Sequence, residues 1–575
     1  MNTRSNVRNN ISRANAMSLM AALLTAVVFA ASACTAATTS TTYYVDCVSG
    51  SDANNGTSAA TPWHSISKIN ATTFSGGDSI LFKRGVTCSI SVSLHPLGSG
   101  SAANPITLGA YGAGALPIIA GSSSITTIYM ENQQGWHIQD LEVTGGNQKA
   151  IQLDNTVSGQ QLTHIRLTNL VVHNTLGNPS DAGASMIQIS AYDAGSGYFD
   201  DVIVDGVTAY SSNLWQGIQI IGGGIDGPAN NNPGQIIVRN STVYSSGGNG
   251  ITVFRANNVT IENNVVHDNG NYNPGAAITQ TPSGIWVWES NNTVAQFNEV
   301  YNQHTYSMAG YDAGGMDFDF GIANTTYQYN YLHDNDGYCI SFFGAYYSGM
   351  TTDTSVNDAA RYNICSNNGH STKSSYEGEF YFSTWNDGFI DGVQIYNNTT
   401  YRNPAIPYAA VYDKGSRFSG TRPRFFMNNI IYSAVSYLID IRNKDITFDY
   451  NLYWSTTGAG IWRMNATNYN TLDSWQAATG FDTHSLFTDP LLNDPTYHAV
   501  GRPINSFTLQ VGSPAINAGV DVGNMGGRDF YGNTIPQGGA YDIGAVESGG
   551  ATDPTATPTL HSWDDRLPVQ TGNRL

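Results

Sequence analysis

The chain has 575 residues, only 12% of them charged, and its formal net charge is −19. This acidic balance argues against nucleic acid as a partner, while 41% apolar residues, 61 glycines and 33 tyrosines argue against a disordered chain. We therefore expect a folded, turn-rich β protein that meets polyanions only through a bridging cation.

The N-terminus has the pattern of an export signal. Three arginines precede an apolar run over 17–33 that ends in small residues, which predicts a signal peptide over 1–33 and a Thr-rich linker over 34–43. Cys34 is a candidate for lipid attachment, but Ala31 stands where lipoprotein signals usually have leucine. The sequence therefore favours a secreted, extracellular protein over a cell-surface lipoprotein.

Four further cysteines lie in the remainder of the chain. Cys47 and Cys88 flank the first folded segment, and in an exported protein we expect them to be able to pair. Cys339 and Cys365 either pair too or remain as two core thiols. No CxxC or HxxxH spacing indicates zinc.

Between about 140 and 455 one short pattern recurs: Asp or Asn, then apolar residues, then a turn. Its steps vary from 23 to 35 residues, as the starting positions show: Asn240, Asn263, Asn298, Asn330, Asn363, Asn397, Asn428 and Asn451. Short runs of Val, Ile, Tyr, Phe and Thr lie between the turns, without helical periodicity. A variable step with a minimum near 23 residues is typical of stacked coils in which insertions lengthen only the loops. Asparagine at the same turn of successive coils predicts a ladder of hydrogen-bonded side chains.

Both ends of this repeat region carry recognisable segments. YYVDCVSGSDANNGTSAATPWHSISK at 43–68, with GGDSILFKRG at 76–85, resembles the opening segment of many secreted right-handed parallel β-helix proteins. GSPAINAG at 512–519 and YDIGAVE at 541–547 resemble their closing segment. The resemblance is to carbohydrate-active proteins of the pectate-lyase-like fold, a fold that also hosts adhesins.

The resemblance and the repeats together imply an all-β, single-stranded solenoid. We expect a right-handed parallel β-helix domain over 44–547, with N-terminal and C-terminal capping segments and regular coils from about 120 to 480. The remainder, 548–575, is predicted to be a disordered Pro/Thr-rich tail. We expect a monomer.

Glycines that precede strands align four coils of the repeat. We place the first and third residues after each glycine inward, as the apolar core: Ile218, Ile220, Ile251, Val253, Ile285, Val287, Met316 and Phe318. The second and fourth residues then point outward: Gln219, Ile221, Thr252, Phe254, Trp286, Trp288, Asp317 and Asp319. In later coils the same alignment predicts these outward residues: Cys339, Ser341, Glu379, Tyr381, Asp440 and Arg442.

The outward set suggests chemistry on sugars. Two aspartates side by side on a strand repel each other, yet GGMDFDFG at 314–321 carries them next to a coil with two tryptophans. Carboxylates one strand pitch or one to two coils apart fall in the range of about 5 to 9.5 Å that glycoside hydrolysis uses. We predict Asp317, Asp319 and Glu379 as catalytic.

The same reasoning predicts residues that bind a polysaccharide substrate: Trp286, Trp288, Tyr381, Arg442 and Lys373. The main hypothesis is thus an extracellular glycoside hydrolase that needs no cofactor. A polysaccharide lyase is the first alternative, in which Lys373 or Arg442 removes a proton while Ca²⁺, held by Asp312 and the two aspartates, neutralises a uronic carboxylate. RNK at 442–444 matches the RxK signature of β-helical polygalacturonases, but their accompanying motifs are missing. A non-catalytic carbohydrate-binding or adhesion protein is the second alternative.

Overall fold

A computed structural model describes residues 40–179, 181–191, 197–223, 234–270, 282–305, 312–345, 354–369, 378–403 and 408–549. All elements below belong to the unit that begins at Thr41. In these described residues the strands form three sheets, of 14, 14 and 13 strands, accompanied by two short helices. No helix in the described ranges is both long and apolar enough to cross a membrane.

Each sheet takes every third strand or so along the chain. Sheet 1 contains β1 (Thr42–Val45), β2 (Ser79–Lys83), β4 (Ile106–Tyr111), β7 (Trp136–Gln139), β10 (Gln161–Thr168), β13 (Tyr198–Asp205), β16 (Ile236–Arg239), β19 (Asn257–Glu262), β22 (Asn291–Gln296), β25 (Thr326–Gln328), β28 (Thr354–Arg361), β31 (Phe389–Tyr396), β34 (Arg424–Met427) and β37 (Thr447–Asp449). Sheet 2 contains β3 (Thr87–Ile90), β5 (Ile118–Gly121), β8 (Glu142–Gly145), β11 (Val171–His173), β14 (Thr208–Tyr210), β17 (Thr242–Tyr244), β20 (Val265–His267), β23 (Glu299–Tyr301), β26 (Tyr331–His333), β29 (Ile364–Ser366), β32 (Thr399–Arg402), β35 (Ile430–Ser433), β38 (Leu452–Ser455) and β41 (Leu486–Phe487). Sheet 3 contains β6 (Ile128–Glu131), β9 (Lys149–Asp154), β12 (Ser185–Ser190), β15 (Gln216–Ile221), β18 (Asn249–Phe254), β21 (Ser283–Trp288), β24 (Gly314–Phe318), β27 (Ile340–Ala345), β30 (Phe380–Trp385), β33 (Val411–Asp413), β36 (Tyr437–Ile441), β39 (Ile461–Met464) and β40 (Thr467–Tyr469). The helices are α2 (Ile66–Asn70) and α3 (Leu472–Thr479).

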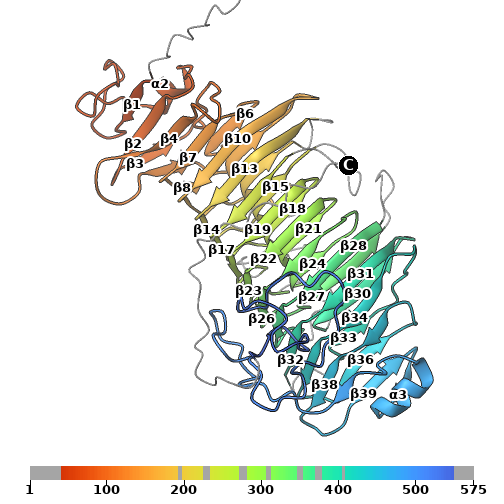
Figure 1. The fold of residues 1–575 in the computed structure, drawn as a ribbon. Coiled ribbons are helices and arrows are strands. Elements are labelled where there is room, and N and C mark those ends of the chain that lie inside the picture. Colours follow the sequence, from red (N-terminus) through yellow and green to blue (C-terminus); the bar gives the residue numbers. More distant parts are fainter. Residues whose placement is uncertain are drawn as a thin grey trace, which may run out of the picture. The chain divides into compact units, whose positions relative to one another are not determined.

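Successive coils stack so that each strand pairs with its equivalent one coil away (Figure 1). The pairing is parallel throughout the named strands except between β39 and β40. The predicted parallel β-helix is therefore confirmed. Sheet 3 starts at β6, near the expected position 120, but sheets 1 and 2 extend further back, to β1 and β3.

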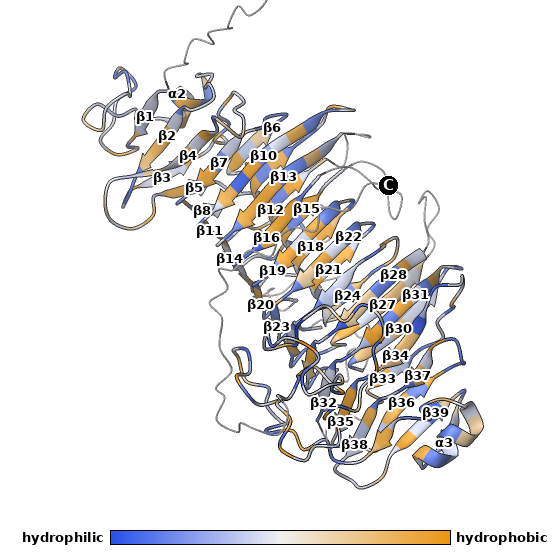
Figure 2. Cartoon of the chain, viewed as in Figure 1, coloured by the Kyte–Doolittle hydropathy of each residue, from blue (hydrophilic) through white to orange (hydrophobic). Residues whose placement is uncertain are grey.

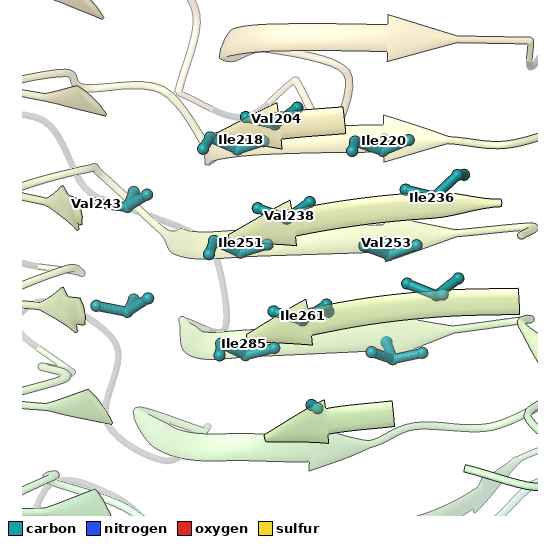
Figure 3. Packing of buried hydrophobic residues seen from close by; sticks show 14 of the residues in the cluster. Val204, Ile218, Ile220, Ile236, Val238, Val243, Ile251, Val253, Ile261 and Ile285 are labelled. Carbon is teal, nitrogen blue, oxygen red and sulfur yellow. The ribbon is translucent and has the colours of Figure 1, made fainter. Parts of the chain in front are cut away.

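The core consists of columns of equivalent apolar side chains. Ile218, Ile251 and Ile285 are in register on successive coils and fully buried, and Figure 3 shows them stacked one above another. All eight residues predicted to point inward have exposed fractions of zero. In Figure 2 hydrophobic colour follows the strands of these middle coils. The period-2 alternation of the sequence thus identified the core.

The asparagine ladder lies in the turn between sheets 1 and 2. Its members are buried, and each amide nitrogen donates to the side-chain oxygen of the next, as in Asn298 to Asn330 at 3.0 Å and Asn330 to Asn363 at 3.0 Å. The full column is Asn264, Asn298, Asn330, Asn363, Asn398, Asn429 and Asn451. The predicted ladder is confirmed.

Both cysteine pairs form disulfides. Cys47 is joined to Cys88, as expected, and Cys339 is joined to Cys365, which decides between the two alternatives that the sequence left open. At the C-terminal end the chain returns along the outside of earlier coils. Gly501 N–H donates to Glu299 at 2.6 Å, and residues from 492 to 546 form a second apolar cluster against sheet 2.

Candidate active site

The outer face of sheet 3 carries one continuous column of side chains, one residue per coil. Strand register places them in this order: Gln152, Gln188, Gln219, Thr252, Trp286, Asp317, Ser341, Tyr381, Tyr412 and Asp440. Asp317 therefore stands between a tryptophan on one side and a serine on the other. Its outward phase follows from Met316 and Phe318, which are fully buried in the core.

The two glycines before this strand have a packing role. A Cβ at Gly314 would lie 1.9 Å from the ring of Tyr338, and one at Gly315 would lie 2.8 Å from the carbonyl oxygen of Cys339. The missing side chains let Tyr338 pass beside the strand, where its hydroxyl bonds to Ser283 at 3.0 Å. The glycines thus allow an aromatic hydroxyl to approach the aspartates.

Asp317 and Asp319 are close together and largely shielded from solvent, with exposed fractions of 4% and 5%. Asp317 accepts a hydrogen bond from the Ser341 hydroxyl at 2.6 Å, and the Tyr338 hydroxyl also donates to it. Asp319 accepts two, from the indole N–H of Trp286 at 2.7 Å and from the backbone N–H of Phe320 at 2.9 Å. Buried carboxylates with so few donors are costly to ionise.

Burial raises the pKa of Asp317 well above its usual value, and the nearby charges of Asp319 and Asp312 raise it further. Burial likewise raises the pKa of Asp319, although its bonds from Phe320 and Trp286 act in the opposite direction. The pair therefore resists carrying two negative charges at neutral pH. Of the two, Asp319 is better suited to the anionic state because N–H donors favour a carboxylate.

Asp312 is the third carboxylate of the site. It lies just before β24, is only partly buried, and its charge raises the pKa of both other aspartates. Among the described residues, the potential ligand atoms that lie within 4.8 Å of one another belong to Cys339, Cys365 and Glu379. Because those cysteines form a disulfide, this group is not a metal site. A calcium role for Asp312 stays a prediction.

Trp286 and Trp288 border a cavity of about 700 Å³ on the outer face of sheet 3. They are half-buried and lie nearly parallel, with ring centroids 5.7 Å apart, and Trp288 stacks on Phe254 at 4.4 Å. Trp286 joins the cavity to the aspartates because the same side chain lines the first and bonds to Asp319. An apolar wall beside a carboxylate pair suits a sugar ring and its glycosidic bond.

The cavity continues along the coils on the N-terminal side, which sequence reasoning had only partly found. Gln219 was predicted to point outward, but Gln152 and Gln188 were missed because Ala150 and Met186 stand where the aligned strands have glycine. A signal was present: Ile-Gln-Ile or Ile-Gln-Leu occurs three times, once in each of β9, β12 and β15.

On the C-terminal side of the aspartates, described aromatic side chains pack against one another. Tyr338, Phe343 and Tyr381 form an apolar cluster and are 0 to 3% exposed. Tyr381 thus has the predicted register, yet it is covered by neighbouring rings. Arg442 lies over the ring of Tyr412, 6.0 Å from its centroid. Neither has a described contact with the aspartates, and their predicted roles in binding substrate stay predictions.

The predicted outward orientation of Glu379 is wrong. Its carboxylate accepts from the Asn368 side chain at 2.8 Å and lies 3.6 Å from the guanidinium of fully buried Arg402. Gly378 has a φ of +120°, and β30 begins only at Phe380, so Glu379 belongs to the turn and not to the outward face. Cys339 was misplaced for the same reason, since it precedes β27 and its disulfide lies in the core.

Burial raises the pKa of Glu379 to about 7, although Arg402 and Asn368 act to lower it. It therefore titrates near neutrality without contacting the aspartate pair in the described structure. Lys373, predicted to bind substrate, lies outside the described residues.

Comparison with known proteins supports this picture of the fold. The family profile described as "Right handed beta helix region" matches residues 192–375. A lacto-N-biosidase of Bifidobacterium longum subsp. longum is 26% identical over 94% of this chain, and the chain spans 39% of that protein's length. The crystal structure of a GH136 lacto-N-biosidase from Eubacterium ramulus superposes with a TM-score of 0.50 at 20% identity, over 66% of this chain and 67% of that one. The coil is thus a right-handed parallel β-helix, as predicted.

Proposed function

We propose that this chain is an exported glycoside hydrolase that acts on glycans containing lacto-N-biose units. The observation that carries the proposal is the pair Asp317 and Asp319, whose pKa values are raised and which adjoin a tryptophan-lined cavity through the bond from Trp286 to Asp319. The lacto-N-biosidase relative supplies the choice of sugar.

The two aspartates take different roles because their surroundings differ. Asp317 has the higher tendency to stay protonated, since it accepts from hydroxyls rather than from N–H groups and the charge of Asp319 raises its pKa. It donates that proton to the leaving oxygen as general acid. Asp319, stabilised as an anion by two N–H donors, acts as the base or nucleophile on the same bond.

The stacked indoles orient the sugar. Trp286 holds Asp319 with its ring nitrogen while its ring contributes to the cavity wall. Substrate binding would displace water from the cavity, which strengthens the interactions of the carboxylates with the developing charge.

Export is supported by two disulfides, which persist in oxidising compartments, together with the signal-like N-terminus. Of the two predicted lyase bases, Arg442 stacks on Tyr412 rather than on the aspartate site, and Lys373 lies outside the described residues. The assay below distinguishes the lyase alternative from the hydrolase.

The test incubates the full chain with p-nitrophenyl lacto-N-bioside and with a panel of lacto-series glycans and uronic-acid polymers, each with and without chelator. We expect release of nitrophenol and new reducing ends, unchanged by chelator. Unsaturated products from a uronic polymer, lost on chelation, would overturn the proposal in favour of a lyase.

Asp312→Asn, Asp317→Asn and Asp319→Asn are assayed together. We expect the Asp317 and Asp319 variants to lose activity. If the Asp312 variant loses as much as the Asp319 variant and the Asp317 variant stays active, Asp312 replaces Asp317 as the proton donor.

A further inference from the structure

The cavity next to the aspartates extends along the coils on their N-terminal side. Its lining residues come from five successive strands of sheet 3: β9, β12, β15, β18 and β21. Four coil steps of about 4.8 Å make this roughly 19 Å along the helix axis. A disaccharide against Trp286 and Trp288 would leave the coils of β9 and β12 without contact.

The lining combines aromatic rings and polar side chains along that length. Phe254, Trp286 and Trp288 lie at the end next to the aspartates, with Arg255 and Glu289; Gln188 and Gln219 lie further away, with Trp215. Gln188 donates to the Gln219 oxygen at 2.7 Å and to the Gly183 carbonyl at 2.9 Å, so the amides are held in fixed orientations. Ordered amides beside aromatic rings suit successive hydroxyl-rich sugars.

Two donors in the wall have no described partner. The indole nitrogens of Trp215 and Trp288 are buried and make no hydrogen bond within the described residues, although both rings line the cavity. Buried N–H groups are rarely left unpaired in folded proteins. Hydroxyl or carbonyl oxygens of a bound glycan would satisfy them, and these two sites lie two coils apart on β21 and immediately before β15.

We propose that this groove binds a glycan longer than a disaccharide on the N-terminal side of the aspartates. The inference rests on the proposed function for the class of ligand, and it adds the length and direction of the substrate. Among the described residues, Tyr338, Phe343 and Tyr381 pack together on the other side of the aspartates. We place the scissile bond at the aspartate end of the groove, with the longer part of the substrate along β21 to β9.

The test measures calorimetric affinity of the full chain carrying Asp319→Asn for lacto-series di-, tetra- and hexasaccharides. We expect affinity to rise with length, by about tenfold or more from di- to hexasaccharide, which corresponds to about 1.4 kcal/mol. Adding Ser190→Trp or Thr156→Trp should reduce the ratio of hexa- to disaccharide affinity toward one, because both positions line the distal groove.

The matched control is Thr260→Trp, on the outer face of sheet 1, which should leave the ratio unchanged. Equal affinity for all three lengths, or a length effect untouched by both blocking variants, overturns this inference while the proposed function stands. Absence of binding to every glycan, disaccharide included, overturns both.

Discussion

Two outer faces of this β-helix carry aromatic side chains, and they use them differently. On sheet 2 six rings stack face to face at 4.8 to 5.0 Å in one column: His173, Tyr210, Tyr244, His267, Tyr301 and His333. On sheet 3 Trp286 and Trp288 lie side by side on one strand and border an open cavity. In the ladder of sheet 2 the ring faces are occupied by neighbouring rings.

The carboxylates of the two regions differ in the same sense. Around sheet 2 they are paired with histidines: a bond from His267 lowers the pKa of Asp268, and His304 adds to the effect. Around sheet 3 burial raises the pKa values of Asp317 and Asp319, and no histidine is among their causes. Ion pairs stabilise the fold around sheet 2. Around sheet 3 the aspartate pair retains a proton, and its burial lowers the free energy of unfolding.

The contrast teaches that an outward aromatic or carboxylate is not in itself a functional signal. In the sheet 2 ladder the rings stack on one another and the carboxylates pair with histidines, so these residues stabilise the fold. A half-buried tryptophan that lines a cavity and bonds to a carboxylate with no cation partner among the described residues is better explained by ligand binding and chemistry.

The sharpest test of the contrast removes one carboxylate from each region. Asp319→Asn should reduce turnover of a lacto-N-bioside by about a hundredfold or more, as loss of an acid or base does, while keeping the fold. Asp268→Asn is the matched control and should keep full turnover. Initial rates measure the turnover of each variant, and circular dichroism checks that each variant is folded. If both variants are equally active, the assignment of Asp319 to the active site is wrong.

A second test uses the energy stored in the aspartate pair. A raised pKa has no effect on stability below the unfolded value of about 3.9, and it destabilises the fold increasingly as pH rises toward the folded value. Asp317→Asn should therefore raise stability by about 1 to 2 kcal/mol at pH 7 and by little at pH 4. Denaturant unfolding at both pH values measures this, and a destabilised variant at pH 7 would contradict it.

A third test compares the rings. The double variant Trp286→Ala and Trp288→Ala should weaken glycan binding about tenfold with little change in thermal unfolding. Tyr210→Ala with Tyr244→Ala should instead lower the unfolding temperature and leave binding unchanged. If the tryptophan variant unfolds early and still binds, those rings serve packing and the binding surface lies elsewhere.

The smallest expected effect concerns His304. Burial alone would lower its pKa, but ion pairs with Asp268 at 3.8 Å and Asp336 at 3.6 Å outweigh it and raise the pKa to about 9. The resulting stability is complete below about pH 6.5 and is lost as pH rises through 9. His304→Gln should cost about 1 kcal/mol at pH 6 and nothing near pH 10, as urea unfolding would show.

Much of the architecture was decided by local pattern in the sequence. Alternation of apolar and polar residues identified the inward columns, including Ile218 and Phe318, and repeated asparagines predicted the ladder. It also placed Asp317 outward beside the coil of Trp286, which the strand register confirms. These features depend on a period of two residues along a strand and on stacking of equivalent coils. Both patterns can be recognised within each single repeat of the sequence.

Other features depended on contacts between coils, which no single repeat contains. Glu379 turned inward because Gly378 delays the start of β30. The pKa of Asp317 is raised by burial and by the charges of Asp319 and Asp312, whereas bonds from Ser341 and Tyr338 on the next coil act to lower it. The cavity likewise arises from side chains of many coils together. The inward or outward orientation of a side chain is set within its own strand, whereas its burial depends on residues from several coils. Only the tertiary structure therefore decided which outward residues form a site.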